Sequence, residues 1–215
     1  MRGALKDIGE SARFEIVMDE SNFELLNLEE LDTLPAEQLA KVRSFTLAGE
    51  YLLTGGNKHI ENRWKNNRNA FYIVDNNTGE AFPAGKGILT DLKRLSGLTG
   101  LEHLELTGQP LETLEGIQSF ANLRNAFFSG ARFTDASPLF KLAGVEIISF
   151  DSTPVTTLEG IQNLKRLVSL NLNNSGVSDI SALKETDFSY AYEGGGFSLM
   201  INRIPCEDLS PLAAV

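Results

Sequence analysis

The chain has 215 residues, 42% of them apolar and 22% charged, with a formal net charge of −10 and a sequence pI near 4.7. This length suits one sizeable core, or a repeat array with a small cap. The acidity argues against nucleic acid or an anionic membrane as the main ligand, because either would require a basic stripe. It favours a basic partner, although acidity that merely keeps a protein dispersed produces the same composition.

The chain has a single cysteine, Cys206, and two histidines, His59 and His103. One cysteine cannot form an internal disulfide and fits a reducing compartment. These side chains are too few for a conventional zinc site, so we expect neither metal nor cofactor. No apolar run is long enough for a secretory signal or a membrane span. These features predict a cytoplasmic protein, and leave open export by a route without a signal.

Residues 1–38 do not match the repeats that follow and are expected to form a small N-terminal α+β cap. Residues 13–18 (RFEIVM) predict a strand. Residues 21–34 (SNFELLNLEELDTL) predict a short helix, with Ser21 as N-cap and Glu24 three positions later. A local negative patch is formed by acidic residues without a base between them, namely Asp19, Glu20, Glu24, Glu29, Glu30 and Asp32.

Residues 39–97 are expected to hold divergent repeats with polar insertions. The spacing of the first apolar positions in the regular repeats recurs at Leu39, Val42, Phe45, Leu47 and Leu52. A second partial copy would use Phe71 and Ile73 as its strand, with Leu89, Leu92 and Leu95 as its return path. The competing interpretation is a β-hairpin over residues 71–82, because DNNTGE between two apolar runs is also a hairpin signal.

A polar insertion at residues 54–69 surrounds the only tryptophan, Trp64, with basic residues: Lys58, Arg63, Lys65 and Arg68. Tryptophan and arginine are the residue types most often found as anchors of protein partners. Nucleic-acid contact is poorly supported by so few bases on an acidic chain. The alternatives are a loop that contacts a protein and a loop that is solvated or packed on its own chain.

Residues 98–183 contain four 22-residue copies of one template, apolar at positions 1, 4, 7, 9, 14, 17 and 20, and all 28 sites obey it. The first copy has Leu98, Leu101, Leu104, Leu106, Leu111, Leu114 and Ile117 at these positions. Positions 7 and 9 share one side of a short strand, and the later spacing of three suits extended or 3-10 turns. A single unit cannot bury its apolar side, so the units must stack.

The motif LxxLxxLxLxxxxLxxLxxI, carried for example by residues 158–183, resembles the 22-residue leucine-rich repeat of internalins and phosphatase regulators. The resemblance implies an α/β solenoid, with short parallel strands on its concave face and extended or 3-10 segments on its convex side. Residues 201–212 resemble a final half-repeat. The chain departs from the family at position 12, where the usual asparagine is replaced by Gln109, Ala131, Thr153 and Ser175, with Asn202 only in the tail.

The residues between the inward leucines are expected on the concave face. At positions 6, 8 and 10 they are His103, Glu105 and Thr107; Asn125, Phe127 and Ser129; Ile147, Ser149 and Asp151; and Ser169, Asn171 and Asn173. Phe127 and Ile147 interrupt an otherwise polar surface, which favours a partner anchor over internal cover or simple exposure. His103, Glu105 and Asp151 lack a recognisable nucleophile, so an acid/base site is not expected.

Residues 184–215 are expected to hold an insertion followed by the terminal half-repeat. Phe188, Tyr190 and Tyr192 alternate, which predicts an extended segment with one aromatic face before three glycines. This segment would either contact a partner or pack over the open end of the array. The glycine run lacks the remainder of a phosphate-binding loop.

The sequence therefore predicts a non-catalytic module that binds one protein partner, expected to be basic, through the concave sheet and inserted loops. An inhibitor or immunity protein for a basic toxin or enzyme is the closest analogy. A regulatory scaffold, and a repeat-bearing effector or enzyme with an unrecognised catalytic part, are the alternatives. The candidate binding residues are Phe127, Ile147, His103, Glu105, Asn125, Ser149, Asp151, Asn171, Trp64, Tyr190 and Tyr192.

Overall fold

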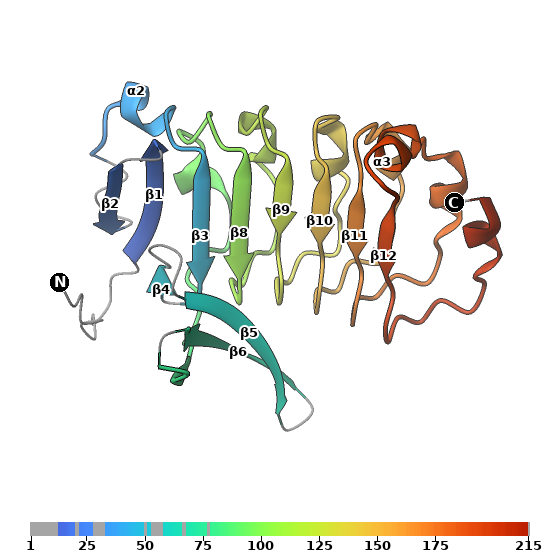
Figure 1. Ribbon diagram of the computed structural model, residues 1–215, viewed down its shortest axis with the longest axis horizontal. Helices are drawn as coiled ribbons and strands as arrows, with labels where there is room; N and C mark the ends of the chain where they lie inside the picture. Colours follow the sequence, from blue (N-terminus) through green and yellow to red (C-terminus); the bar gives the residue numbers. More distant parts are fainter. Residues whose placement is uncertain are drawn as a thin grey trace.

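The computed structural model is a solenoid whose parallel strands lie side by side in one sheet (Figure 1). It describes residues 13–19, 22–27, 33–49, 51–52, 58–65, 68–76 and 78–214. The order of strands in the large sheet is β12-β11-β10-β9-β8-β3-β1-β2. Its parallel strands are β3 (Ser44–Ala48), β8 (His103–Thr107), β9 (Asn125–Phe127), β10 (Ile147–Ser149), β11 (Ser169–Asn171) and β12 (Ser198–Met200).

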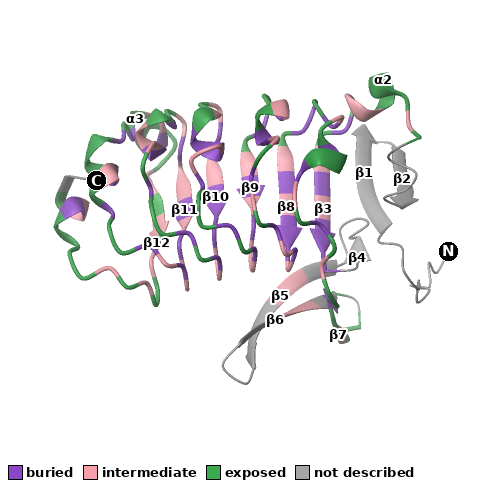
Figure 2. Ribbon diagram, turned by 180° about the vertical axis from the view of Figure 1, so that it is seen from behind, coloured by how far each residue is buried: buried purple, intermediate pink, exposed green. Residues whose placement is uncertain are grey.

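The register of these strands follows the apolar template. Position 7 of each coil pairs with position 7 of the next, as in Phe45 with Leu104 and Leu170 with Leu199. All template residues of the four regular copies are buried except Leu142, which is partly buried against the same core (Figure 2). Burying one such side chain contributes about 1.5–3 kcal/mol, so the stacked rows stabilise coils that could not fold singly.

The convex side is built from 3-10 turns, as the spacing of three predicted. They are η1 (Lys93–Leu95), η2 (Ile117–Ser119), η3 (Leu139–Lys141), η4 (Ile161–Asn163), η5 (Ser181–Glu185) and η6 (Ser210–Ala214). The side chain at position 20 is buried in each of the first five turns. Within the described part of the chain, no helix has the length and apolar character that crossing a membrane requires.

Position 11, which follows each strand, has a left-handed backbone in every coil. The residues and their φ angles are Gly49 (56°), Gly108 (68°), Gly130 (78°), Ser152 (60°), Asn174 (55°) and Arg203 (57°). Glycine adopts this conformation without the steric cost that a Cβ atom brings. The three glycines lie in the first coils and the three other residues in the last, and this division matters for what packs against them.

The first coil is a single repeat that a small sheet interrupts. Strand β4 (Tyr51–Leu52) pairs antiparallel with β3, so the prediction of Leu52 at position 14 is wrong. The positions of the return path are instead filled by Leu89, Leu92 and Leu95, which are buried in the main core. Local spacing could not reveal this, because the matching residues are separated by the whole inserted sheet.

The inserted sheet, here called the arm, consists of β5 (Lys58–Lys65), β6 (Arg68–Asp75) and β7 (Ala81–Pro83). Phe71 and Ile73 belong to β6 and pair with β5 and β7, so the prediction of a second divergent repeat strand is wrong. The hairpin interpretation describes this segment correctly, with Ile73 opposite Phe82. Trp64 lies in β5 opposite Asn69, so its segment is a strand and not a loop.

The arm packs against the glycine turns of the first coils. A Cβ atom at Gly130 would lie 2.6 Å from the Phe71 ring, and one at Gly108 would lie 3.3 Å from it. A Cβ atom at Gly49 would lie 1.9 Å from the Ala84 carbonyl oxygen. Glycine at position 11 therefore leaves room for the arm in the first three coils. The last three coils carry other residues at this position.

The N-terminal cap contains two antiparallel strands, β1 (Arg13–Asp19) and β2 (Asn22–Asn27), and a short helix, α2 (Ala36–Leu39). The helix predicted from Ser21 is wrong, since β2 occupies its first turns. Strand β1 pairs with both β2 and β3, and such pairing overrides a weak local helix preference. The predicted acidic patch falls on side chains outside the described ones.

The C-terminal insertion forms helix α3 (Ser189–Glu193) where an extended segment was predicted. The amide of Tyr192 donates to the Phe188 carbonyl oxygen at 3.1 Å, which closes the turn. Phe188 is buried, with its ring centroid 4.2 Å from that of Phe197. Phe188 is buried whereas Tyr192 is exposed, so the prediction of an extended segment with one aromatic face is wrong.

Strand β12 fixes the register of the last coil. Because Met200 pairs with Asn171, Asn202 falls at position 10 and not at the predicted position 12. Its backbone amide donates to the Asn173 side-chain oxygen at 2.8 Å. The main polar contacts of a residue at position 12 are those of Gln109, in the first regular coil. The buried Gln109 accepts from the Ile88 and Leu89 amides at 2.9 and 3.1 Å and donates to the Gly49 carbonyl at 2.7 Å.

Replacing Gln109 by methionine, which keeps the volume, should leave three backbone groups without their partner, of which the Leu89 amide and the Gly49 carbonyl are buried. We expect the free energy of unfolding to fall by about 3–5 kcal/mol, because each orphaned group costs roughly 1–3 kcal/mol. Ser175→Ala is the matched control at the same template position, where the hydroxyl accepts one long bond of 3.4 Å from Val177. Urea denaturation of both variants checks this, and equal losses would contradict the role given to Gln109.

The contact between Phe71 and Gly130 should appear as a coupling energy. Asparagine tolerates the left-handed backbone, as Asn174 does at the same position, so Gly130→Asn tests mainly the clash with the Phe71 ring. We expect a loss of about 1–3 kcal/mol that largely disappears in a Phe71→Ala background. Ser152→Asn is the control. Equal losses in both backgrounds, measured by chemical denaturation, would show that the arm does not pack there.

Candidate protein-interaction surface

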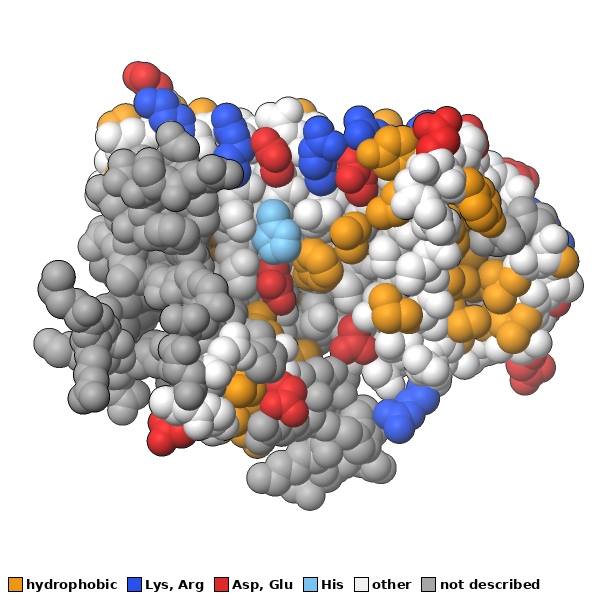
Figure 3. All heavy atoms as spheres, in the orientation of Figure 1, with side chains coloured by type: hydrophobic (Ala, Val, Ile, Leu, Met, Phe, Trp, Pro, Cys, Tyr) orange, Lys and Arg blue, Asp and Glu red, His pale blue; other side chains and the backbone are white. Residues whose placement is uncertain are grey.

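The concave face is defined here by the side chains at positions 6, 8 and 10 of β3 and β8 to β12. One strand at each end of this parallel row adds residues that the sequence did not assign: Ser44, Thr46 and Ala48 on β3, and Ser198 and Met200 on β12, with Asn202 after it. None of these positions carries lysine or arginine. Figure 3 shows a histidine near the middle of this face, with acidic and apolar side chains beside it.

A central cluster is formed by His103, Glu105 and Phe127. The His103 and Phe127 rings are 5.3 Å apart between centroids, and their planes are tilted by 42°. The His103 Nε2 atom is 4.0 Å from Glu105 Oε2, and the Thr107 hydroxyl donates to Glu105 Oε1 at 3.3 Å. Glu105 and Phe127 are directly opposite in the pairing of β8 with β9. The three residues lie on two strands, β8 and β9, and the register between these strands places them side by side.

Burial shifts both titratable groups of the central cluster toward their neutral forms. Desolvation lowers the pKa of His103 below its usual value. Burial raises the pKa of Glu105, and the hydrogen bond from Thr107 offsets part of this effect. The imidazole is therefore neutral at neutral pH, and its 4.0 Å contact with Glu105 is not an ion pair.

Phe127 and Ile147 are both partly exposed on neighbouring strands. The pairing of β9 with β10 sets Ile147 opposite Asn125, and Phe127 opposite Ser149. The two apolar side chains are therefore diagonal neighbours rather than directly opposite. Such diagonal pairs lie roughly 7–8 Å apart, which one apolar side chain of a partner can span.

The remaining predicted residues of this face differ in accessibility. Asn125, Asp151 and Asn171 are partly exposed, whereas Ser149 is only 7% exposed and offers little contact area. The Asn174 side chain donates to Asp151 at 3.0 Å. Asp151 follows β10, which is two strands from β8, so the structure does not join Asp151 to His103 and Glu105. Among the described residues, no group of three or more potential metal ligands is assembled.

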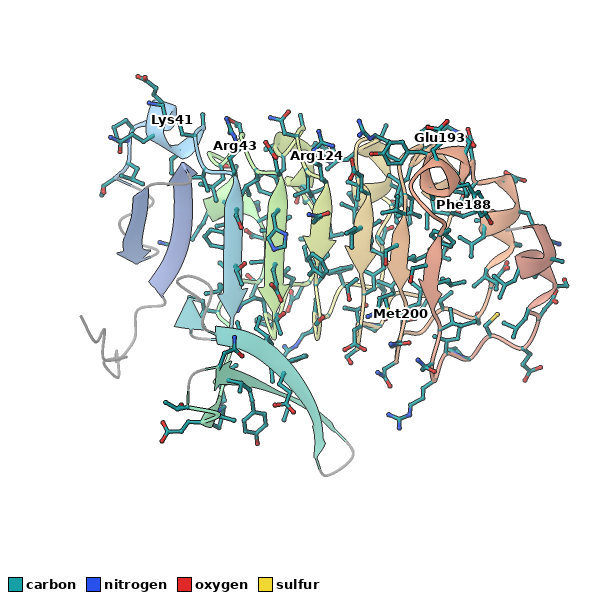
Figure 4. All side chains as sticks on the ribbon, viewed as in Figure 1. Lys41, Arg43, Arg124, Phe188, Glu193 and Met200 are labelled. Carbon is teal, nitrogen blue, oxygen red and sulfur yellow. The ribbon has the colours of Figure 1, made fainter. Side chains whose placement is uncertain are left out.

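A rim of charged side chains borders the concave face at position 5, and the prediction from sequence missed it. Arg43 lies 3.6 Å from Glu102, and Arg124 lies 2.6 Å from Glu146 in the next coil (Figure 4). The signal was present, because Glu102, Arg124 and Glu146 alternate in sign at 22-residue intervals. Exposed pairs of this kind contribute about 0–1 kcal/mol each, so the rim orders side chains more than it stabilises the fold.

The two predicted tyrosines have different roles in the structure. Tyr190 ends the rim, since its hydroxyl accepts from Arg166 at 2.8 Å and the Arg166 guanidinium lies 4.6 Å from its ring centroid. Arg166 also pairs with Glu146 at 3.1 Å. Tyr192 is 58% exposed on α3. Met200, 38% exposed at position 8 of β12, is a further apolar side chain of the concave face (Figure 4). The Trp64 side chain lies outside the described residues.

Comparison with solved structures supports the assignment of the fold. No protein-family model matches the chain, and no curated protein matches it in sequence. An internalin of Listeria monocytogenes, InlF, superposes on 92% of this chain with a TM-score of 0.56 at 18% identity. Internalin C2 of the same organism superposes on 86% of this chain and 87% of its own, with a TM-score of 0.51 at 16% identity.

The chain has an internalin-like leucine-rich repeat fold. At these identities the likeness concerns the fold alone, and the chain spans only 44% of the length of InlF. The predicted solenoid, with parallel strands on one face and 3-10 turns on the other, is confirmed. What the surface binds has to be argued from its own residues.

The raised pKa of Glu105 predicts how stability depends on pH. Because the folded state holds this proton more tightly than the unfolded state, ionisation destabilises the fold at pH values above the folded pKa. Glu105→Gln should therefore raise the free energy of unfolding near pH ~7, and the gain should fade toward pH ~4, where both states are protonated. Urea denaturation at the two pH values tests this. A difference independent of pH would contradict the burial effect.

Proposed function

We propose that this chain is a non-catalytic module that binds one protein partner on its concave face. The observation that carries the proposal is the partly exposed pair Phe127 and Ile147, set in a polar sheet face between a charged rim and the arm. Interfaces commonly have an apolar centre surrounded by polar side chains. The stacked coils hold these residues at fixed spacing, so little conformational entropy is lost when a partner binds.

The likeness to internalins supports this class of function, since the repeat array presents one extended sheet face. The partner that we propose is a basic protein, because the chain has a net charge of −10 and its concave face carries acids without bases. A regulatory scaffold is the alternative within the same class of binding modules, and a repeat-bearing effector with an unrecognised catalytic part is the alternative from a different class.

Within this class, we favour an inhibitor or immunity protein that acts in the cytoplasm. An acidic surface that covers the basic cleft of a toxin or enzyme is a common arrangement for such inhibitors. A neighbouring gene that encodes a basic toxin domain would support this role. A partner that retains full activity in the complex would instead favour the scaffold.

The test is capture of partners from a lysate of the source organism by wild type and by the double variant Phe127→Glu, Ile147→Glu. Both side chains are partly exposed, so the variant should fold, with an unchanged circular dichroism spectrum. We expect capture of a single stoichiometric partner to fall at least ~10-fold, since truncation or charge at an interface centre commonly costs 2 kcal/mol or more.

The matched control changes two exposed apolar residues away from the concave strands, Ile88→Glu with Leu209→Glu. This control adds the same charge and should retain the partner. Loss of the partner in the control as well would point to a nonspecific effect of negative charge. Full retention by the folded Phe127 and Ile147 variant would refute binding through the concave face.

A further inference from the structure

We infer that the concave face takes an arginine side chain of its partner, with the guanidinium paired to the Glu105 carboxylate and stacked on the Phe127 ring. This inference rests on the proposed function and deepens it, because it names the chemistry that a partner brings to the same surface. It concerns one position in the middle of the face, where β8 and β9 are neighbours.

Glu105 has no lysine or arginine partner among the described residues of the concave face. Its side chain is 27% exposed, and its neighbours on this face are the Thr107 hydroxyl at 3.3 Å and His103 at 4.0 Å. The imidazole is neutral at neutral pH because burial lowers its pKa. No lysine or arginine occupies a concave position among the described residues, so a cation of a partner would meet no competing base at these positions.

The rim shows that this chain pairs other acids internally. Glu102 lies 3.6 Å from Arg43, and Glu146 contacts both Arg124 and Arg166 at 2.6 and 3.1 Å. These acids sit at position 5, and each has its arginine in an adjacent coil or on the same edge. Glu105 sits at position 8, where the adjacent strands offer Thr46 and Phe127 in place of a base. The missing cation is therefore specific to the centre of the face.

Phe127 decides between arginine and other basic groups. It lies opposite Glu105 on the neighbouring strand, and adjacent strands are about 4.8 Å apart. A planar guanidinium can stack on an aromatic ring and still donate from its edge to a carboxylate, whereas the compact ammonium of lysine makes only one of these contacts well. The His103 ring, 5.3 Å from Phe127, closes one side of the position.

The free energy of covering Glu105 also favours arginine over an apolar side chain. A partner that covered Glu105 with apolar atoms would bury a carboxylate without a countercharge, and that desolvation would be unfavourable. An arginine removes the penalty and gains the apolar contact with Phe127. Selectivity then comes from rejecting partners that lack a base at this point, while the apolar pair supplies contact area.

The test uses a probe in place of the partner. We would titrate N-acetyl-arginine amide into the full chain, following the carboxyl carbon of Glu105 and the ring protons of Phe127 by NMR. Saturable shifts are expected at concentrations on the order of millimolar, as suits one isolated contact. The pKa of Glu105 should fall when the probe is present, because a bound cation favours the ionised form.

Three controls make the outcome decisive. Glu105→Gln should abolish the saturable shifts of Phe127, whereas Asp151→Asn, which removes a carboxylate from the same face, should leave them unchanged. N-acetyl-citrulline amide, which has the same shape without the charge, should produce no saturable shift. The amide spectrum of each variant shows directly that it is folded.

Equal shifts with the citrulline probe, or shifts that survive Glu105→Gln, would overturn the inference. Equal binding of N-acetyl-lysine amide would overturn the choice of arginine. Failure here is separable from failure of the proposed function, since capture of a partner can still depend on Phe127 and Ile147 when the arginine probe does not bind. Conversely, probe binding together with capture that ignores both apolar residues would leave this site intact and refute the wider surface.

Discussion

Each of the four regular coils depends on its neighbours for burial of the same seven template positions. A coil alone would leave its leucines in contact with water, so the free energy that folds the array comes from the contacts between coils. Because stacking requires position 7 to lie on position 7, the same constraint fixes every outward position. For this reason one row of the face is formed by His103, Asn125, Ile147 and Ser169. The neighbours of each outward residue are fixed by the stacking of the coils.

The left-handed turn at position 11 explains where the array accepts an insertion. After this turn the chain has left the sheet and has not yet returned to the core, so added residues displace no buried side chain. The arm enters shortly after Gly49 and returns before Leu89. A Cβ atom at Gly130 would clash with the Phe71 ring and one at Gly108 would crowd it, which ties the composition of two later turns to an insertion in an earlier coil.

The features that sequence predicted well are those set by spacing. Burial at the template positions, the parallel strands and the 3-10 return path follow from intervals of 22, two and three residues, and the structure confirms this solenoid. The failures at Asn22–Asn27 and Ser189–Glu193 have the opposite origin. Each is a short segment whose conformation depends on contacts outside the segment itself, with β1 for the first and with Phe197 for the second. Local pattern cannot report such contacts.

On the candidate surface too, the features set by template spacing could be predicted, whereas those set by contacts between coils could not. Phe127 and Ile147 could be assigned to the concave face from their positions in the template, and their role in binding stays a prediction. Their diagonal placement, and the pairing of Glu105 with Phe127, required the register between coils. Met200 was missed because the last coil contains an insertion that shifts its strand. The rim has a signal in the sequence, because three successive residues at position 5 alternate in charge at the 22-residue interval of the repeat.

The two kinds of residue at the centre of the face have different consequences for a partner. Phe127 and Ile147 gain from almost any apolar contact, so they contribute affinity with little discrimination. A half-buried carboxylate acts differently, because covering it is unfavourable unless the covering surface supplies a cation. Glu105 lowers the stability of the free protein at neutral pH through its raised pKa, and it has no compensating partner among the described residues of the concave face. A half-buried carboxylate beside the two apolar side chains therefore restricts which surfaces can cover this part of the face.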